Sequence, residues 1–383
     1  MKAIINGRAI LADKSGKFFT QKDAHILFDT CVEKIFAGDI PSEILNLPEK
    51  NITDAKNKYV SPGFINIHAH GALGADTMDE TKDALEIFAK AQSSMGVTSF
   101  LPTTMSYDIP RVQRAFNRIK KAMEKSSGAK ILGANMEGPY ISKTRAGAQD
   151  AKYIKQADFS DIENFTDVIK IITLAPETVT DDFFKKAEKS GIIFSIGHSD
   201  ATYEEALDAI KSGKVSHITH LYNAMTPFHH RKPGIVGAAF DTEVTAEIIA
   251  DNVHSLPTAQ RLAYKMKGIE KIILITDSMR ASCLGDGISE LGGQKVTVKG
   301  NLATLENGAI AGSVAKMNDV IRIFKENTGI KLEEAIEAAT KNPAKLLKMY
   351  DKIGSIETDK SADFAVFDDE FNIFTTVIDG EIV

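Results

Sequence analysis

The chain of 383 residues contains little cysteine and no long apolar stretch. Its two cysteines, Cys31 and Cys283, form no CxxC motif, which argues against a disulfide framework and against a cysteine-ligated zinc site. No apolar run reaches the roughly 18 residues of a membrane-spanning helix, and the N-terminal segment lacks the apolar core of a signal peptide. We therefore expect a cytoplasmic protein that does not interact with membranes.

Several catalytic and cofactor motifs are also absent. The sequence has no Gly-x-Ser-x-Gly elbow, no catalytic cysteine signature, no Gly-x-Gly-x-x-Gly and no Walker A pattern. A serine or cysteine nucleophile, NAD and ATP are therefore not indicated. The net charge of -6 is well mixed along the chain, which argues against a nucleic-acid partner.

Strand-like and helix-like segments alternate through the middle of the chain. Amphipathic segments with helical period, such as residues 81–90 and 203–210, separate most of the apolar runs. Eight strand–helix repeats over about 290 residues predict an α/β fold of the (β/α)8 TIM barrel type. The eight predicted strands are Phe64–Ile67, Val97–Leu101, Ile131–Met136, Val168–Leu174, Ile192–Ile196, Val215–Leu221, Ala246–Ala250 and Lys271–Ile275.

Short β-prone runs broken by Gly, Asp, Asn and Pro occupy both ends of the chain. Two β-rich ends around a long middle predict a small β-sandwich domain built from both termini. We expect residues 1–58 and 352–383 to form this domain and residues 59–351 to form the barrel.

Polar residues that can bind a metal follow the predicted barrel strands, at the carboxyl end where barrel enzymes place their chemistry. His68 and His70 are two residues apart, so an extended strand points both side chains to one face. Histidine and carboxylate ligands converging on one rim are the composition of a divalent metal site. The candidate ligands are His68, His70, Glu137, His198 and His220.

Each candidate also has a plainer interpretation. Glu137 could be a loop carboxylate or a helix cap, and His198 could be a turn residue. His217 and His220 are an odd number of residues apart, so a regular strand would point them to opposite faces. We expect His220 to be the ligand and His217 to pack against a helix. Asp277 could cap a helix, but its place after the last predicted strand favours a proton carrier.

The chemistry of this set is hydrolytic. A divalent metal lowers the pKa of bound water and polarises a carbonyl group. A nearby carboxylate, for which Asp277 is the candidate, can take a proton from that water and pass it to the leaving group. The sequence therefore predicts a hydrolase of amide, cyclic amide or amidine bonds.

The motifs resemble those of the N-acetylglucosamine-6-phosphate deacetylase family, in the amidohydrolase superfamily. The motifs are Pro-Gly-Phe-Ile-Asn-Ile-His-Ala-His-Gly at 62–71, Glu-Gly-Pro-Tyr-Ile at 137–141, Gly-His-Ser at 197–199, Thr-His-Leu-Tyr-Asn-Ala-Met at 219–225 and Thr-Asp at 276–277. The resemblance covers essentially the whole chain. It implies removal of acetate from N-acetyl-D-glucosamine 6-phosphate, in amino-sugar catabolism and cell-wall sugar recycling.

The resemblance also implies roles for the site residues. Glu137, His198 and His220 would hold one divalent metal, and His68 and His70 would hold a second in members that keep this pair. One or two ions per subunit are expected, and the sequence does not choose among Zn, Fe, Mn and Co. Asp277 would activate water and then protonate the departing amine.

The implied substrate contacts include a phosphate-binding arginine. Asn223 and the backbone at Ala224 would contact the phosphate or the sugar, with Arg231 and His254 beside them; an arginine suits phosphate because its charged fork donates in pairs. In this family the Arg and a His can come from the neighbouring subunit, so a homodimer is implied. The implied substrate-binding set is Ala148, Gln149, Asn223, Ala224, Arg231, His254, Ile310, Ala311 and Gly312.

Gln149 stands where some relatives carry a carbonyl-polarising histidine, and a neutral amide is the weaker electrophile.

Two alternatives to this function remain open. Another amidohydrolase, such as a cyclic-amidase or D-aminoacylase relative, would keep the metals and Asp277 but not the phosphate contacts. A non-catalytic barrel scaffold would not need the metal ligands together with Asp277. Preference between glucosamine and galactosamine substrates is not decided by the sequence.

Overall fold

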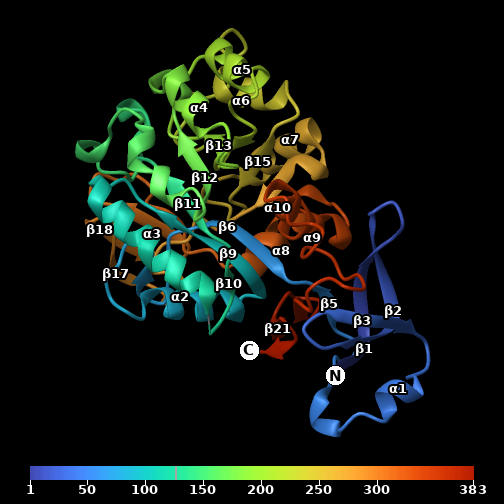
Figure 1. Cartoon of the computed structure of the whole chain (residues 1–383). Helices are drawn as coiled ribbons and strands as arrows, with labels where there is room; N and C mark the ends of the chain where they lie inside the picture. Colours follow the sequence, from blue (N-terminus) through green and yellow to red (C-terminus); the bar gives the residue numbers. More distant parts are fainter. Residues whose placement is uncertain (126) are drawn as a thin grey trace.

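The computed structural model describes residues 1–125 and 127–383, which form a parallel barrel and a smaller sheet (Figure 1). The barrel strands lie in the order β6, β9, β11, β12, β13, β14, β15 and β16, and every neighbouring pair along this order is parallel. The backbone N–H of Asp277 donates to the carbonyl oxygen of His68 (2.9 Å), which links the last strand to the first. The predicted eight-stranded α/β barrel is confirmed.

Each predicted strand has a counterpart in the barrel, although some are shorter than expected. Their residues are almost all buried, because a parallel barrel is covered on both faces, and this explains the continuous apolar runs. A short strand, β10 (Lys130–Ile131), also pairs with β9 ahead of β11. The strands are β6 (Phe64–Ala69), β9 (Val97–Thr104), β11 (Ala134–Glu137), β12 (Ile169–Leu174), β13 (Ile193–Ile196), β14 (His217–Ile218), β15 (Thr245–Ile248) and β16 (Ile272–Leu274).

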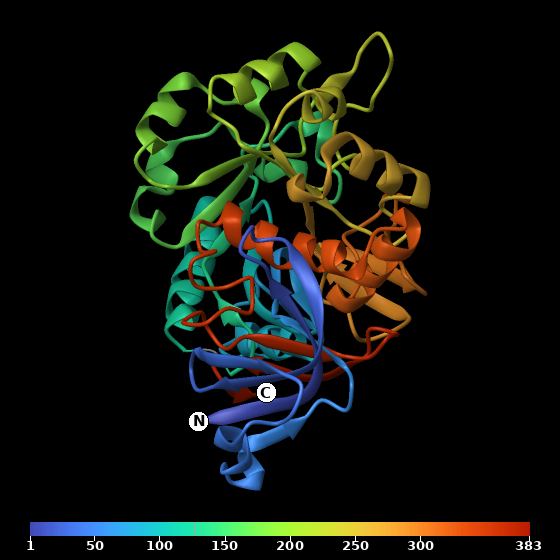
Figure 2. The same ribbon diagram turned by 90° about the vertical axis from the view of Figure 1, so that its right-hand side faces the viewer.

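Helices surround the barrel (Figure 2). They present apolar residues such as Phe88, Phe116 and Phe324 to one continuous core with the outer faces of the strands. The helices are α2 (Ala84–Ser94), α3 (Ile109–Glu124), α4 (Asp181–Ala187), α5 (Tyr203–Lys211), α6 (Gly234–Phe240), α7 (Pro257–Lys267), α8 (Met317–Thr328), α9 (Leu332–Ala339) and α10 (Lys341–Leu346). Among the described residues, no helix is long and apolar enough to cross a membrane.

The two ends of the chain share the smaller sheet, as predicted. Its order is β22-β21-β20-β5-β1-β2-β3, with β4 beside β1, and β20 pairs antiparallel with β5. Strand β5 runs directly into β6, so this sheet adjoins the first metal-ligand motif. Division of the chain at residues 58 and 352 remains a proposal. The elements are β1 (Lys2–Ala12), β2 (Phe18–Phe28), β3 (Val32–Ala37), α1 (Ser42–Leu45), β4 (Ile52–Asp54), β5 (Tyr59–Pro62), β20 (Phe364–Phe367), β21 (Ile373–Ile378) and β22 (Glu381–Ile382).

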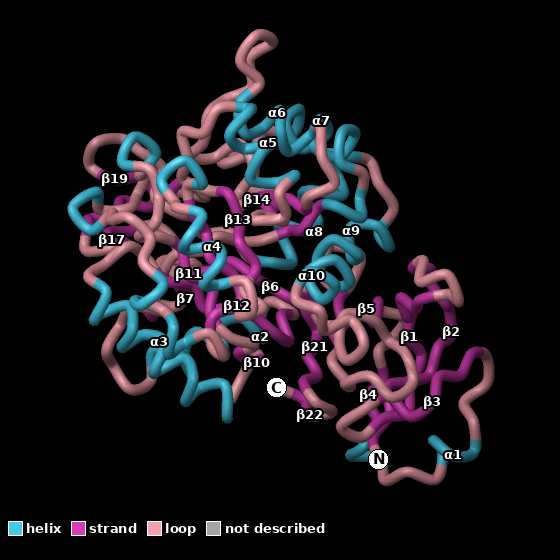
Figure 3. Tube along the Cα trace, turned by 45° about the horizontal axis from the view of Figure 1, so that its top comes forward, coloured by secondary structure: helices cyan, strands magenta, loops and turns pink. Residues whose placement is uncertain are grey.

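Two antiparallel insertions follow barrel strands. The hairpin β7 (Gly71–Ala72) and β8 (Ala75–Asp76) follows β6, and a three-stranded sheet of β17 (Gly287–Leu291), β18 (Gln294–Lys299) and β19 (Leu302–Leu305) follows β16. The tube view shows a further loop projecting from the molecule next to α6 (Figure 3). These segments, rather than the barrel itself, distinguish one rim of the barrel from the other.

Candidate active site

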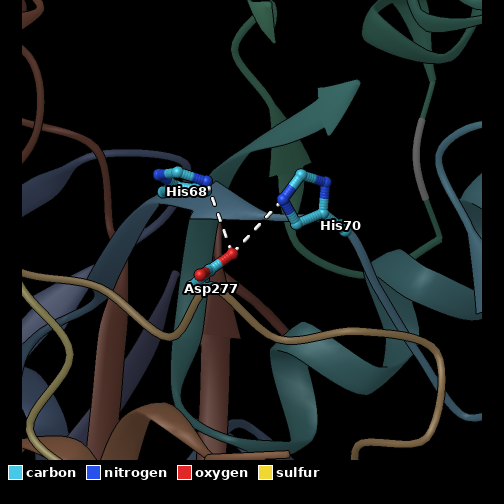
Figure 4. A group of neighbouring side chains, drawn as sticks. All are labelled: His68, His70 and Asp277. Atoms are coloured by element: carbon cyan, nitrogen blue, oxygen red, sulfur yellow. Dashed lines mark ion pairs between the residues drawn. The ribbon is translucent and has the colours of Figure 1, made fainter. Parts of the chain in front are cut away.

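The six residues predicted to bind metal or carry protons lie together in two buried groups. One group is Glu137, His198 and His220, and the other is His68, His70 and Asp277. Within each group the candidate ligand atoms all lie within 4.8 Å of one another. In the second group Asp277 Oδ1 is 3.2 Å from His70 Nε2 and 3.5 Å from His68 Nε2 (Figure 4).

Glu137 connects the two groups. Its Oε1 atom lies 3.2 Å from His198 Nε2 and 3.1 Å from His220 Nε2. The Oε2 atom lies 3.3 Å from His70 Nε2. The carboxylate at the end of β11 is therefore in position to contact ions held by either group.

Left-handed backbone turns aim three of these side chains. His198, His220 and Asp277 each follow a barrel strand and have φ values of 49°, 30° and 50°. A non-glycine residue in this region costs about 1–3 kcal/mol, and such residues cluster at functional sites. Hydrogen bonds from neighbouring loops hold the turns: Ser142 N–H donates to the His198 carbonyl and Ser313 N–H to the Asp277 carbonyl, both at 2.8 Å.

The same turn corrects the expectation for His217. Strand β14 ends at Ile218, so the alternation of side chains does not extend to His220. The polar atoms of His217 contact the neighbouring strand β15 and not a helix. Its Nδ1 lies 2.7 Å from Thr245 Oγ1 and its Nε2 lies 3.2 Å from Glu247 Oε1, in the network beneath the candidate ligands.

The hydrogen bonds of the histidines suit a cation. His198 Nδ1 donates to the Arg145 carbonyl (2.9 Å), and His70 Nδ1 donates to the Thr103 carbonyl (3.2 Å). A ring held this way presents an Nε2 lone pair, and these lone pairs face carboxylate oxygens. Buried His68 Nε2 has no hydrogen-bond partner among the described residues. Lone pairs facing one another need a positive charge between them, so the residues fit a divalent metal.

Electrostatics also require positive charge among these groups. Burial raises the pKa of Glu137, but His198 and His68 outweigh it and hold the carboxyl pKa well below its ordinary value. Burial also raises the pKa of Asp277, and His68 and His70 again outweigh it and keep the pKa low. Burial lowers the pKa of His70, whereas hydrogen bonds to Asp277 and Glu137 raise it to about 9. The carboxylates are thus ionised, and a cation or ring protons must balance their charge.

A cavity of about 270 Å³ opens above these groups and collects most of the predicted substrate contacts. His68 lies beneath it, fully buried, and Ala311 is buried behind its wall. Arg231 does not line the cavity; it lies exposed in the loop before α6. The cavity is lined by His70, Met105, Glu137, Gly147, Ala148, Gln149, His198, His220, Asn223, Ala224, His254, Asp277, Leu291, Ala309, Ile310 and Gly312.

Gln149 is held firmly at the edge of the metal centre. Its Nε2 donates to Glu137 Oε2 (2.6 Å), and its Oε1 accepts from the Ser106 N–H (2.7 Å). The amide predicted to face the substrate carbonyl therefore also orients the bridging carboxylate. One of its two amide hydrogens is committed to Glu137.

His254 also lines the cavity and is oriented by Asp251. Its Nδ1 is 2.7 Å from Asp251 Oδ2, and its backbone N–H donates to Asp251 Oδ1 (2.8 Å). Burial lowers the pKa of His254, but the bond to Asp251 outweighs burial and raises it above its ordinary value. A ring that keeps its proton can attract an anionic substrate group.

Several residues of the site were not predicted from the sequence. Met105, Gly147 and Leu291 line the cavity without any motif of their own. Glu247, fully buried on β15, contacts three of the histidines. A signal for Glu247 did exist, because a carboxylate inside an apolar strand run is costly unless it is paired.

Comparison with known proteins gives a consistent result. Residues 59–383 match the amidohydrolase family model. The chain is 42% identical over 344 residues to N-acetylglucosamine-6-phosphate deacetylase of Bacillus subtilis (strain 168), covering 87% of this chain and 86% of that protein. It is 30% identical over 339 residues to N-acetylgalactosamine-6-phosphate deacetylase of Escherichia coli O157:H7, covering 87% and 89%.

A solved structure extends this likeness to the fold. The crystal structure of N-acetylglucosamine-6-phosphate deacetylase from Pasteurella multocida superposes with a TM-score of 0.91 at 29% identity. The superposition covers 100% of this chain and 99% of the other. Barrel and terminal sheet are therefore both shared.

Proposed function

The chain belongs to the amidohydrolase family, and within it to the N-acetylglucosamine-6-phosphate deacetylases; on this premise we propose that it hydrolyses the acetamide of N-acetyl-D-glucosamine 6-phosphate. The products are D-glucosamine 6-phosphate and acetate, which places the enzyme in amino-sugar catabolism and cell-wall sugar recycling. Its location is the cytoplasm.

One observation carries this proposal. Two groups of metal-fitting side chains, joined by Glu137, form the floor of a cavity that also contains Asn223, Ala224 and His254. Amide-bond chemistry at the floor and polar groups on the wall match a substrate with an acetamide at one end and a phosphate at the other.

Glu137, His198 and His220 would hold one divalent ion, and His68 and His70 would hold a second. Zn, Fe, Mn and Co all suit histidine and carboxylate ligands, so each subunit takes one or two ions of these metals. A bound ion supplies Lewis acidity, which polarises the amide carbonyl and lowers the pKa of water.

Asp277 carries the proton. Its pKa is held low, so the carboxylate is ionised and can accept a proton from the attacking water. The water oxygen attacks the acetamide carbon, the C–N bond breaks, and Asp277 returns the proton to the departing sugar nitrogen. Gln149, whose Nε2 donates to Glu137 Oε2 and to Met105 Sδ, would face the substrate carbonyl, and Ala148 and the loop of Ile310, Ala311 and Gly312 would enclose the sugar.

The phosphate end is bound by polar groups from two subunits. Asn223 and the backbone at Ala224 contact it within one subunit, beside His254. Arg231 is exposed and is not among the residues that line its own cavity, so we assign it to the cavity of the partner subunit in a homodimer.

An exposed apolar patch supports this dimer. The patch consists of Phe228, Leu262 and Met266, whose exposed fractions are 58%, 46% and 52%. These residues border a hollow of about 360 Å³ between α6, α7 and the loop that carries Arg231. A contiguous patch of large apolar side chains on a surface is typical of an interface.

A second substrate class deserves a test, because one relative is a galactosamine enzyme. Purified protein should be offered N-acetylglucosamine 6-phosphate and N-acetylgalactosamine 6-phosphate, and acetate and free amine should be quantified together. We expect equal amounts of the two products, faster release from the glucosamine substrate, and competitive inhibition by glucose 6-phosphate. Faster hydrolysis of a cyclic amide or an N-acyl-D-amino acid, without inhibition by glucose 6-phosphate, would instead identify a different amidohydrolase.

A further inference from the structure

Glu247 lies beneath the metal centre, and the reaction described above does not use it. The residue is on β15, its side chain is 0% exposed, and it does not line the cavity. A buried carboxylate is costly unless its oxygens are hydrogen-bonded. The contacts that satisfy it therefore indicate what it does.

The Oε2 atom of Glu247 contacts both groups of the metal centre. It accepts from His68 Nδ1 (2.9 Å) and from the backbone N–H of His220 (3.0 Å). The Oε1 atom lies 3.2 Å from His217 Nε2, and Thr245 Oγ1 lies 2.7 Å from the other nitrogen of that ring. One oxygen is thus shared by a side chain of one group and the main chain of the other.

The bond to His68 determines which nitrogen faces the metal centre. With the proton on Nδ1, the lone pair is on Nε2, which lies 3.4 Å from Glu137 Oε1 and 3.5 Å from Asp277 Oδ1. Among the described residues Nε2 has no hydrogen-bond partner of its own, so the bond from Nδ1 to Glu247 is the one that selects the tautomer. A carboxylate behind a ligating histidine also increases the basicity of the ligand.

The bond to His220 steadies a strained turn. His220 has a φ of 30°, outside the regions that side chains favour, and its amide hydrogen is directed at Glu247. Loss of this acceptor leaves a buried N–H without a partner in a turn that already carries strain.

We propose that Glu247 is a positioning residue of the metal centre, which fixes the His68 tautomer and the His220 turn so that both ions are bound in register. This inference rests on the proposed metal-dependent function. It is tested most sharply by the conservative variants E247Q and E247D. Gln keeps the length and an accepting oxygen but loses the charge, whereas Asp keeps the charge but is shorter by one methylene.

Ion binding is the readout, independent of turnover. Metal-free wild type, E247Q and E247D are titrated with Co²⁺ against a competing chelator, and visible absorption reports each bound ion. If Glu247 positions the metal centre, E247Q should lower the Co²⁺ affinity of the His68 site by about 10-fold and E247D by about 100-fold, which is the range found for groups that hold metal ligands in place. The control is E337Q, which alters a buried carboxylate that accepts from Phe18 N–H at the terminal sheet, and it should bind Co²⁺ like wild type.

The outcomes separate the possibilities. If both Glu247 variants bind Co²⁺ with wild-type affinity, Glu247 does not position the metal centre. If E247Q binds Co²⁺ more weakly than E247D, the charge of Glu247 matters and its geometry does not, which also overturns the proposal. Thermal unfolding of the metal-free proteins shows whether a variant is less stable than wild type. The Co²⁺ affinity of such a variant is measured at a temperature at which it is still folded. If wild type binds two ions but releases no acetate, the proposed substrate fails while the role of Glu247 stands.

Discussion

In the proposed mechanism, Asp277 is the residue on which turnover depends most directly. Its carboxylate lies at the cavity floor, and its pKa is kept low by His68 and His70 despite burial. D277N retains shape but cannot accept a proton, so we expect kcat to fall by about 10²–10⁴-fold with a smaller change in KM. Steady-state acetate release measures this.

A matched control for D277N is D369N. Asp369 forms an ion pair with Arg8 in the terminal sheet, away from the cavity lining, and its variant should turn over like wild type. Near-normal turnover of D277N would remove Asp277 from the proton transfer.

His254 predicts a pH dependence of substrate binding. Its pKa is raised by Asp251 despite burial, so the ring would stay protonated above its ordinary pKa and, on the proposed function, attract the phosphate dianion. Attraction is lost as pH rises through this raised pKa, so KM should increase on the alkaline side. KM measured from about pH 6 to about pH 10 tests this for wild type and H254N. An alkaline rise that persists unchanged in H254N would show that another group is responsible.

At the scale of elements, the residues that follow the strands tell more about function than the strands themselves. All eight barrel strands were predicted, because a strand covered on both faces is continuously apolar. The predicted run Val215–Leu221 reduces to β14, since His220 adopts a left-handed turn. Such turns depend on contacts from distant loops, and this is why side-chain alternation placed His217 incorrectly.

The site residues could be predicted from the sequence about as well as the barrel strands. His68, His70, Glu137, His198, His220 and Asp277 were found from motifs at strand ends, and they lie together. Leu291 was not found, because β17 is an insertion whose position over the cavity follows from the fold and from no local pattern. Ala311 is the opposite case: it was predicted to contact the substrate, but its side chain is buried and does not line the cavity, although its neighbours Ile310 and Gly312 do.

Helix α5 offers a test of how an element supports the site. It follows β13 and His198, and it begins with a capping box. In this box Glu205 N–H donates to Thr202 Oγ1 (3.2 Å) and Thr202 N–H donates to Glu205 Oε2 (2.8 Å). T202A should cost about 1 kcal/mol of stability and lower Tm by about 1–2 °C. T202S, which keeps the hydroxyl, should melt like wild type. Equal melting of all three proteins in calorimetry would contradict a stabilising cap.

At the scale of the whole molecule, the proposed active site is completed by a second subunit. Arg231 is exposed on the loop before α6, next to the apolar patch of Phe228, Leu262 and Met266. If Arg231 acts across the interface, R231A and D277N should complement each other. In a mixed dimer, one cavity has both an intact Asp277 and the partner subunit's Arg231.

R231A is expected mainly to raise KM for the phosphorylated sugar, so random mixing of R231A and D277N, assayed below that KM, should restore about a quarter of wild-type sites. Acetate release is measured after the two proteins are dissociated and reassembled, and each protein treated alone is the control. No gain over the separate variants would mean that Arg231 serves its own cavity or does not read phosphate. The sequence could not decide this, because the contact between subunits leaves no periodic pattern in one chain.

The central claim is that one cavity joins amide hydrolysis to recognition of a sugar phosphate. It is tested most directly by comparing kcat/KM for N-acetylglucosamine 6-phosphate and for unphosphorylated N-acetylglucosamine, on protein whose metal content has been counted. We expect one or two ions per subunit and a preference of at least about 100-fold for the phosphorylated sugar, since charge-assisted contacts are lost without the phosphate. Equal rates for the two sugars, or no acetate from either while metal is bound, would contradict the claim.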